Sequence, residues 1–280
     1  MDIRFFEPLP ILKPFIATIW TVESPIAYSP GDLKTILPNG RIKLIFPYRG
    51  LLRNSPDGMI YQNNHENSLW FLGISDQPWF IDHDEGAYGT LAVEFRPGAA
   101  YRFFNISHKA ALNQVVPYQD ILGKGYGAWQ NLLAEELKIE GKVDLLQKFL
   151  ITLLSKNSPQ DSLVDHAVAL IQARKGLITI NELSERMGCS TRWLAMKFEC
   201  RVGISPKTLA EILRFQNQFA FLTRFGTGNK QVDFDDGYFD QAHFTKEFKR
   251  FAGLPPAQYT RAKNEFFNLF HRTSESYKTR

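Results

Sequence analysis

The residue types that most often perform catalysis or bind metals are few in this chain and widely spaced. The 280 residues include two cysteines, Cys189 and Cys200, and six histidines. The cysteines form no Cys-x-x-Cys pair, and His65, His83 and His108 are far apart with no His-x-His pair. The chain also lacks a nucleophile–base motif, a phosphate-binding loop and a dinucleotide fingerprint. We therefore expect a protein that is not an enzyme, with reduced thiols, no metal and no cofactor.

A repeated segment carries the next signal. Phe198–Leu209 is echoed fifty residues later by Phe248–Tyr259, and each copy has a glycine five residues after the phenylalanine and a proline three residues after that. A repeat of this length indicates a duplicated supersecondary unit. Each unit is predicted to be a helix, a tight turn, a second helix and a glycine–proline exit. This is the outline of a helix-turn-helix, which places one helix in the major groove of DNA.

The elements around the first copy have clear start and stop signals. A helix is expected from about Leu163 to Lys175, ending at Gly176. Thr179–Glu182 has the Thr-x-x-Glu pattern of a capping box, and Ser190 is a good N-cap for the next helix. The apolar spacing then predicts packing roles for a set of aromatic and aliphatic residues: Trp193, Leu194, Phe198, Phe215, Phe244 and Phe248.

A longer helix should link the two copies. Ser205 and Pro206 provide a cap and a favoured first residue, and the helix is predicted to continue to about Arg224. About 19 residues span roughly 28 Å. This length approaches the spacing of about 34 Å between successive major-groove faces, so two recognition helices could reach adjacent groove segments.

The N-terminal half has a different pattern, with short aromatic and β-branched runs that predict strands: Ile42–Phe46, Trp70–Ile74, Trp79–Ile81 and Thr90–Phe95. Such strands favour a small β-barrel or sandwich. Helical spacing follows in Trp129–Leu137 and Val143–Leu154. The fold class is therefore mixed: an N-terminal small β-barrel with flanking helices (residues 1–155), a linker (156–162) and an all-α C-terminal domain with two tandem helix-turn-helix motifs (163–280).

Charge is divided unevenly between these halves. The net charge is +4, but residues 163–280 hold 18 Lys and Arg against 12 Asp and Glu, whereas residues 1–162 are net −2. A basic repeated half suits a phosphate-binding surface. The N-terminus lacks the apolar stretch of a signal peptide, and no apolar run approaches the ~18 residues of a membrane span. We expect a cytoplasmic protein with no membrane partner.

The C-terminal motifs resemble a known family. Ser190–Phe198, Gly203–Pro206 and Gly237–Pro256 look like the signature of AraC/XylS-type bacterial transcription regulators, and the resemblance covers about residues 163–265. Leu37–Gly40 and Phe95–Gly98 resemble the sensor-like domains of one subgroup. This second resemblance implies a compact, cupin-like barrel that senses a ligand or mediates dimerisation. Separately, a set of aromatic residues could either line an apolar effector pocket or form ordinary barrel core: Trp20, Trp70, Trp79, Phe95 and Tyr101.

The resemblance also implies which residues contact DNA. The base-facing positions are, in the first recognition helix, Arg192, Ala195 and Met196, and in the second, Gln241, Ala242, Thr245 and Lys246. Lys249 and Arg250 are expected to contact phosphates. Arg can bond bidentately to guanine and Gln to adenine, whereas Ala and Met can only pack on a thymine methyl. Family members often carry Arg at the position of Met196, so its absence predicts weaker readout there.

The second motif departs from the pattern in its supporting helix. Asp233 stands where a small apolar residue is usual, and Asp236 stands where a core aliphatic residue is usual. Val232–Asp236 is a poor helix interior, because burying unpaired carboxylates costs several kcal/mol. This helix should be short, frayed or rotated, and its acids should repel phosphate.

Together these features predict a sequence-specific DNA-binding transcription regulator that reads adjacent major-groove segments and is controlled at its N-terminal domain. Its expected partners are double-stranded DNA, a second copy of the chain in a homodimer, a small-molecule effector and RNA polymerase. Two alternatives stay open. One is a metal-dependent cupin-like enzyme with a DNA-binding appendage. The other is an interaction protein with a degenerate second motif.

Overall fold

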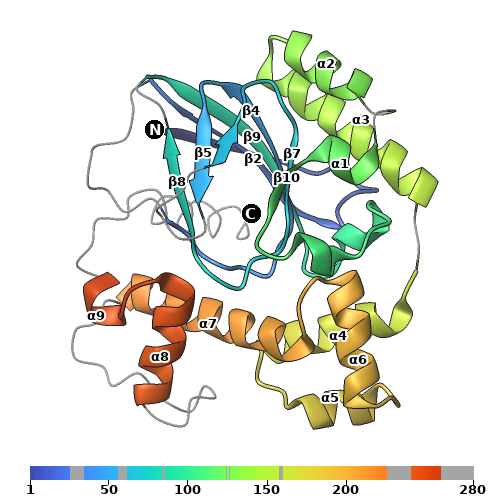
Figure 1. The fold of residues 1–280 in the computed structure, drawn as a ribbon, viewed down its shortest axis with the longest axis vertical. Helices are drawn as coiled ribbons and strands as arrows, with labels where there is room; N and C mark the ends of the chain where they lie inside the picture. The colour runs from blue at the N-terminus through green and yellow to red at the C-terminus, as the bar shows by residue number, and fades with distance from the viewer. Residues whose placement is uncertain are drawn as a thin grey trace.

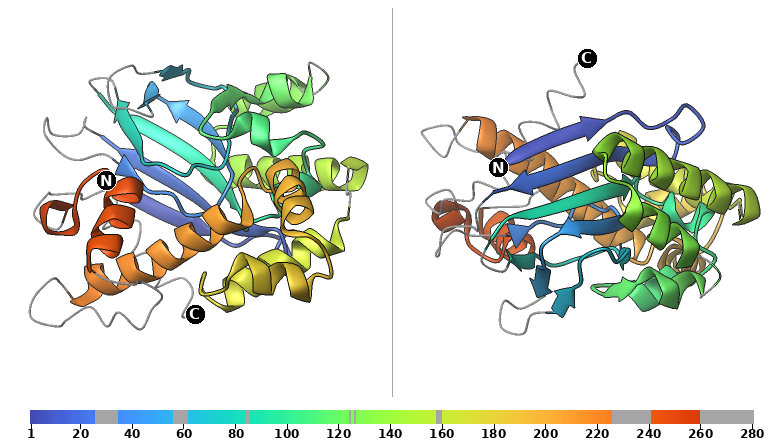
Figure 2. Two further views of the ribbon diagram at one scale, coloured as in Figure 1. Left: turned by 60° about the horizontal axis from the view of Figure 1, so that its bottom comes forward. Right: turned by 90° about the horizontal axis from the view of Figure 1, so that it is seen from above.

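A computed structural model describes residues 1–25, 35–55, 62–83, 86–123, 125, 127–157, 160–225 and 241–259. Two β-sheets form the N-terminal part, and helices cover one side of them (Figure 1). The C-terminal helices lie along another side, with the long helix α7 (Pro206–Phe225) running beneath the sheets (Figures 1 and 2). The predicted fold class, a small β-barrel domain followed by an all-helical domain with helix-turn-helix motifs, is confirmed.

The strands form two antiparallel sheets. The six-stranded sheet has the order β1-β2-β9-β4-β7-β10, and the four-stranded sheet has the order β3-β8-β5-β6. The strands of the larger sheet are β1 (Asp2–Phe6), β2 (Ile16–Ser24), β9 (Tyr88–Phe95), β4 (Lys43–Arg49), β7 (Trp70–Leu72) and β10 (Val115–Pro117). Those of the smaller sheet are β3 (Thr35–Ile36), β8 (Trp79–His83), β5 (Leu52–Ser55) and β6 (Gln62–Asn64). Each of the four predicted strand segments therefore overlaps one of these strands, although Trp70–Ile74 extends two residues beyond β7.

The larger sheet is buried on both faces. One face joins the smaller sheet around a cluster that includes Trp20, Ile45, Ile81 and Ala92. The other face contributes residues such as Val93 to a second, larger cluster. Burial on both faces explains why β9 is buried at every position, with no polar alternation.

Helices and turns of the N-terminal part cover that second face. They are the 3-10 turns η1 (Ala100–Arg102) and η2 (His108–Ala111) and the helices α1 (Tyr118–Leu122), α2 (Gly127–Glu135) and α3 (Ile139–Asn157). Leu146, Phe149 and Leu153 follow helical spacing on α3 and are fully buried. The helix therefore presents a continuous apolar stripe to the sheet.

The C-terminal helices are α4 (Ser162–Ala173), α5 (Ile180–Arg186), α6 (Thr191–Arg201), α7, α8 (Gln241–Ala252) and α9 (Pro256–Tyr259). The predicted caps are confirmed. Thr179 accepts a hydrogen bond from the Glu182 amide at 3.1 Å, and Ser190 accepts one from the Trp193 amide at 3.2 Å. Ser205 caps α7 through the Thr208 amide at 3.1 Å. These bonds satisfy donors that each helix leaves free at its N-terminus.

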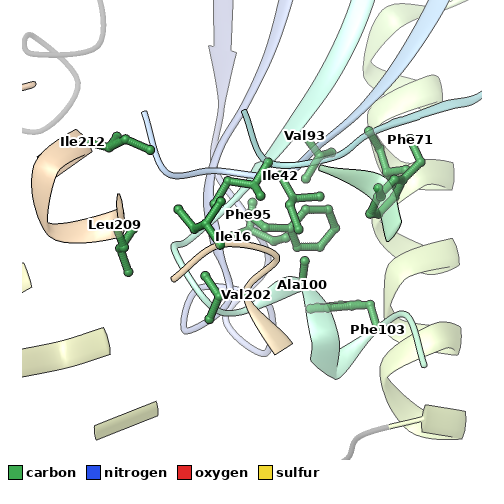
Figure 3. Close-up of a cluster of buried hydrophobic side chains, with 14 of the residues drawn as sticks. Ile16, Ile42, Phe71, Val93, Phe95, Ala100, Phe103, Val202, Leu209 and Ile212 are labelled. Atoms are coloured by element: carbon green, nitrogen blue, oxygen red, sulfur yellow. The ribbon is translucent and has the colours of Figure 1, made fainter. Parts of the chain in front are cut away.

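One apolar core joins the two halves. Val202, Leu209 and Ile212 from the C-terminal half belong to the same buried cluster as Ile16 and Phe95 from the sheet (Figure 3). Gly203, with φ of 98°, is buried at this junction, where an added Cβ would lie 2.7 Å from Ile74 Cγ2. The close approach therefore requires a glycine, as does the backbone angle.

The segment predicted as a linker contributes to this junction. Helix α3 ends at Asn157, and α4 begins at Ser162 with Asp161 as its N-cap. The Asp161 carboxylate lies 3.1 Å from Lys197 Nζ, and its backbone amide donates to the Tyr101 hydroxyl at 3.0 Å. The described end of the segment is thus anchored to both halves. In the portion of the chain that is described, no helix is long and apolar enough to cross a membrane.

Candidate nucleic-acid interface

The first helix-turn-helix is formed by α5, a turn at Gly188 and α6. Leu183 and Ser184 on α5 and Leu194 and Phe198 on α6 are buried, so the two helices pack through these positions. Gly188 has φ of 63°, which a turn this tight between helices needs. The packing leaves the N-terminal part of the opposite face of α6 exposed, whereas Glu199 farther along that face pairs with Lys109 of the N-terminal half at 2.7 Å.

That exposed part of the face carries the residues predicted for the first recognition helix. Arg192 and Met196 are exposed, and Ala195 is half-buried. Trp193 is also exposed at 38%, so its predicted packing role is wrong. It is the neighbour of Arg192 on the outer face, and Lys197 Nζ lies 5.1 Å above its ring. This cation–π contact holds Lys197 against the indole ring of Trp193.

Helix α8 presents the residues predicted for the second recognition helix. Its apolar side buries Phe244, Phe248 and Phe251 at helical spacing. The opposite side exposes Gln241, Ala242, Lys246, Lys249 and Arg250, with Thr245 half-buried. The supporting helix predicted before it, with Val232–Asp236, lies outside the described residues.

Two ion pairs orient α8 on α7. Arg214 Nη2 on α7 lies 2.5 Å from the buried Glu247 carboxylate on α8. Arg250 Nη1 lies 2.8 Å from Glu211, also on α7. Arg250 Nη2 further lies 3.6 Å from Asp76 in the N-terminal half. Arg250, one of the two residues predicted to contact phosphate, is therefore paired with carboxylates from both halves. Asp76 carries no sequence signal, because the pairing joins residues far apart in the chain.

A cavity opens between the two sheets on the N-terminal side. Its interior is about 60 Å³, and the whole hollow including its opening is about 810 Å³. Trp20 and Trp79 line it, as predicted for an apolar pocket. Trp70 belongs to the surrounding inter-sheet cluster. Phe95 and Tyr101 instead lie in the core on the other side of the larger sheet. The ring centroids of Phe95 and Phe103 lie 5.1 Å apart there, and the Tyr101 hydroxyl donates to the Asp165 carboxylate at 2.7 Å.

A charged cluster occupies one wall of this cavity. Arg41 Nη1 donates to the Glu94 carboxylate at 2.9 Å, and Asn39 Nδ2 donates to the same oxygen at 3.3 Å. Lys43 Nζ donates to Asn39 Oδ1 at 3.3 Å. Burial alone would raise the pKa of Glu94, but Lys43 and Arg41 hold that pKa below its usual value. The carboxylate is therefore ionised and paired.

The rim of the cavity touches the C-terminal helices directly. Leu37–Arg41 contributes four lining residues, and the Pro38 carbonyl accepts a hydrogen bond from Gln216 on α7. An added Cβ on Gly40 would lie 3.0 Å from Leu209 Cδ1. On the other side, Ser75 lines the cavity and is the chain neighbour of Asp76. One rim segment of the cavity thus contacts α7, and another is next in the chain to the residue that pairs with Arg250 on α8.

The residue types first considered for chemistry remain apart. Both cysteines are free, with Cys189 half-buried and Cys200 exposed. His108 is buried beside Phe71, and burial with the nearby Arg201 lowers its pKa to about 4. Within the described ranges, no three His, Cys, Asp or Glu side chains lie close enough to hold a metal ion.

Comparison with known proteins identifies two regions. A helix-turn-helix domain matches residues 183–262, a range that begins within α5 and includes α6 to α9. The chain therefore carries a helix-turn-helix domain in its C-terminal half. A domain of unknown function (DUF6597) matches residues 4–117, which hold both sheets. No curated protein sequence matches the chain significantly.

The solved structures that align with most of the chain include ToxT and an AraC-like transcriptional activator. ToxT from Vibrio cholerae, at 1.65 Å resolution, has 13% identity and a TM-score of 0.48 and covers 86% of this chain and 98% of its own. A ToxT structure with a bound unsaturated fatty acid has 11% identity and a TM-score of 0.47 over 86% and 95%. The AraC-like transcriptional activator CuxR has 15% identity and a TM-score of 0.27 over 84% and 90%. Structural similarity at these identities and TM-scores does not indicate which ligand the chain binds.

Proposed function

We propose that this protein is a sequence-specific transcription regulator, not an enzyme, that reads adjacent major-groove segments of duplex DNA with α6 and α8. The observation that carries the proposal is the exposed outer face of α6. This face holds Arg192, its helix is capped and packed on α5, and it lies in the matched helix-turn-helix domain. An exposed guanidinium at a recognition-helix N-terminus is suited to bidentate bonding with guanine.

The length of α7 supports a paired reading. Its 20 residues correspond to roughly 30 Å at a rise of ~1.5 Å per residue. Helix α7 links the two units, and α8 is fastened to it by Arg214–Glu247. A span of this length brings the second recognition helix near the next groove segment, about 34 Å along the duplex. Modest DNA bending would close the difference.

We further propose that the inter-sheet cavity holds a small effector that changes the docking of the C-terminal helices. The supporting observation is the shared rim, where Pro38 contacts Gln216 and Asp76 pairs with Arg250. An effector can shift docking only if it binds the docked and undocked states with different affinity. Rim residues that touch both the cavity and the helices provide a structural basis for that difference.

Self-association and polymerase contact complete the proposal. Leu132 and Leu137, near the end of α2, are 45% and 92% exposed, and they offer an apolar patch for a second copy of the chain. A homodimer would bind two half-sites with a gain in effective concentration. Analytical ultracentrifugation of the protein and of Leu137→Asp tests this step. An activating role would add RNA polymerase as a partner, which recruitment of the holoenzyme to bound DNA would reveal.

Selection of bound fragments from random DNA, followed by a salt titration, tests the function. We expect an enriched motif with two blocks about one helical turn apart. Gln241→Ala should weaken the base preference in the second block of the motif and leave the preference in the first block unchanged. Absence of any enriched motif, with binding lost at modest salt, would favour the interaction protein with a degenerate second motif.

A further inference from the structure

Two asparagines lie side by side on the inward face of the smaller sheet. Asn54 on β5 pairs in register with Gln62, and Leu52 pairs with Asn64 on β6. Asn54 and Asn64 are therefore diagonal neighbours on one face, since side chains two residues apart point the same way. Both line the inter-sheet cavity, and both are almost fully buried, at 4% and 0% exposure.

In the part of the chain that the structure describes, two of the four polar side-chain atoms of this pair have a hydrogen-bond partner, and two have none. Asn64 Nδ2 donates to Asn54 Oδ1 at 2.6 Å. Among the described residues, Asn54 Nδ2 and Asn64 Oδ1 have no partner. A buried polar group left unsatisfied costs about 1–3 kcal/mol. Turning both amides over would exchange the two free atoms but would still leave one donor and one acceptor. In either assignment the pair therefore keeps an unpaired donor next to an unpaired acceptor, within two residues that line the cavity.

We propose that Asn54 and Asn64 form the recognition site for a neutral ligand whose edge carries an acceptor beside a donor, as in a primary amide or a lactam. The ligand carbonyl accepts from Asn54, and the ligand N–H donates to Asn64. This inference rests on the proposed role of the cavity as the effector site, and it names the chemical class of the effector.

The donor set selects against the common charged alternatives. A carboxylate has only acceptor oxygens, so one of them would face Asn64 Oδ1 unpaired. An ammonium group has only donors, so it would face Asn54 Nδ2 in the same way. The cationic wall does not require an anion either, because Arg41 is already paired with Glu94 and Lys43 donates to Asn39.

The rest of the cavity defines the body of the ligand. Trp20, Trp79, Ile81 and Val115 contribute aromatic and aliphatic walls. An interior of about 60 Å³ suits the polar end of a small molecule, whose apolar body would extend toward the opening of the cavity. Such sites combine an apolar lining with a few oriented polar groups. A small aromatic amide fits this description.

Binding of three matched probes to the full-length protein, without DNA, tests the proposal. The probes are benzamide, benzoate and N,N-dimethylbenzamide, measured by calorimetry and by the fluorescence of the cavity tryptophans. We expect benzamide to bind at least tenfold more tightly than benzoate, which lacks the donor and is charged. N,N-dimethylbenzamide keeps the carbonyl but lacks the N–H, so it should also bind at least tenfold more weakly. Equal binding of the three, tighter binding of benzoate or no binding of benzamide would overturn the proposal.

A variant pair adds a test within the protein. Asn54→Leu/Asn64→Leu removes both unsatisfied groups, so we expect a higher Tm together with at least a tenfold loss of benzamide affinity. Asn63→Leu lies on the outer, exposed face of the same strand and should leave binding unchanged. Unchanged benzamide binding in the double variant would contradict the proposal. If the double variant does not fold, the probe series on the unaltered protein still decides.

These outcomes are separable from the proposed DNA-binding function. Probe binding is measured without DNA, and the selection of DNA motifs needs no ligand. Loss of the amide preference with an intact DNA motif would reject only the ligand class. Failure of motif enrichment with an intact amide preference would reject only the regulator assignment.

Discussion

Arg192 is the residue on which the first recognition helix depends most. Its neighbours on the outer face, Ala195 and Met196, cannot donate hydrogen bonds, so the guanidinium is the strong hydrogen-bonding group among the three predicted readers. Five donors in a planar fork match the two acceptors of guanine. A lysine has the same charge but lacks the fork.

This difference gives a prediction for Arg192. Arg192→Ala should weaken binding to the selected site by about 1–3 kcal/mol and relax preference at one base pair. Arg192→Lys should restore nonspecific affinity but not that preference. Competition binding with single-base variants of the site measures both. Full recovery of preference in Arg192→Lys would mean that the residue contacts only phosphate.

His108 gives a second prediction at the residue scale. Its ring is buried, and neither nitrogen has a hydrogen-bond partner among the described residues. Burial, with a smaller contribution from Arg201, lowers its pKa to about 4, below the ordinary value of 6.5. The unfolded chain therefore binds a proton at higher pH than the folded chain does. Stability is lost as the pH falls from about 6.5 and stops changing below about 4.

Between pH 7 and pH 5 this histidine should reduce the free energy of unfolding by about 2 kcal/mol. Urea denaturation of the protein and of His108→Leu at both pH values measures the difference. The leucine variant should lack this part of the acid sensitivity. An identical pH dependence in the two proteins would show that His108 is not the group responsible.

At the scale of elements, the exit from α6 joins the two halves. Gly203 has φ of 98° and lies against Ile74 and the His108 carbonyl. Gly188, in the turn before α6, also has a positive φ, but an added Cβ there would meet nothing within 4 Å. Substituting each glycine in turn therefore separates two costs to stability. One is the cost of the positive φ, which both share, and the other is the cost of crowding neighbouring atoms, which only Gly203 has.

Gly203→Ala should lower the free energy of unfolding more than Gly188→Ala does. The reason is that the added methyl group at residue 203 would overlap Ile74 and the His108 carbonyl. A single unfavourable backbone angle costs about 1–3 kcal/mol, and overpacking adds a similar amount. Thermal unfolding of the two variants gives the comparison. Equal losses would show that the junction adjusts to the extra methyl group.

Sequence patterns predicted these elements well because their signals are local. Thr179, Ser190 and Ser205 cap their helices through residues three positions ahead, so a short window contains all the information. The strand segment Thr90–Phe95 was likewise recognisable from its residue types. Trp193 was assigned wrongly because its large apolar side chain suggested burial, whereas the packing of Leu194 and Phe198 places it on the outer face.

At the scale of the whole molecule, the docking of the two halves restrains α8. Asp76 pairs with Arg250, and Pro38 is bonded to Gln216, so the cavity rim holds both α7 and α8. The Asp76–Arg250 pair is partly exposed, and such pairs contribute roughly 0–1 kcal/mol. Releasing this one contact should change DNA binding modestly and measurably.

Asp76→Asn should increase DNA affinity by up to about fivefold and steepen the dependence of affinity on salt by about one phosphate contact. The asparagine can keep the hydrogen bonds between this position and Asn113. Asp165→Asn on α4 is the control, because it removes another ion pair between the halves, to Arg102 at 3.7 Å, and lies on neither recognition helix. A salt slope in Asp76→Asn equal to that of the unaltered protein would mean that Arg250 does not reach phosphate.

The amino-acid sequence by itself determined the helix-turn-helix repeat, the caps and the strand-rich N-terminal half, because each depends on residues close together in the chain. Only the tertiary structure decided that Trp20 and Trp79 line a cavity while Phe95 and Tyr101 do not, since that depends on which face of a doubly buried sheet each residue occupies. It also decided the partners of Arg250 and the pairing of Asn54 with Asn64. Such contacts arise from the packing of sheets and helices, and no local pattern encodes them.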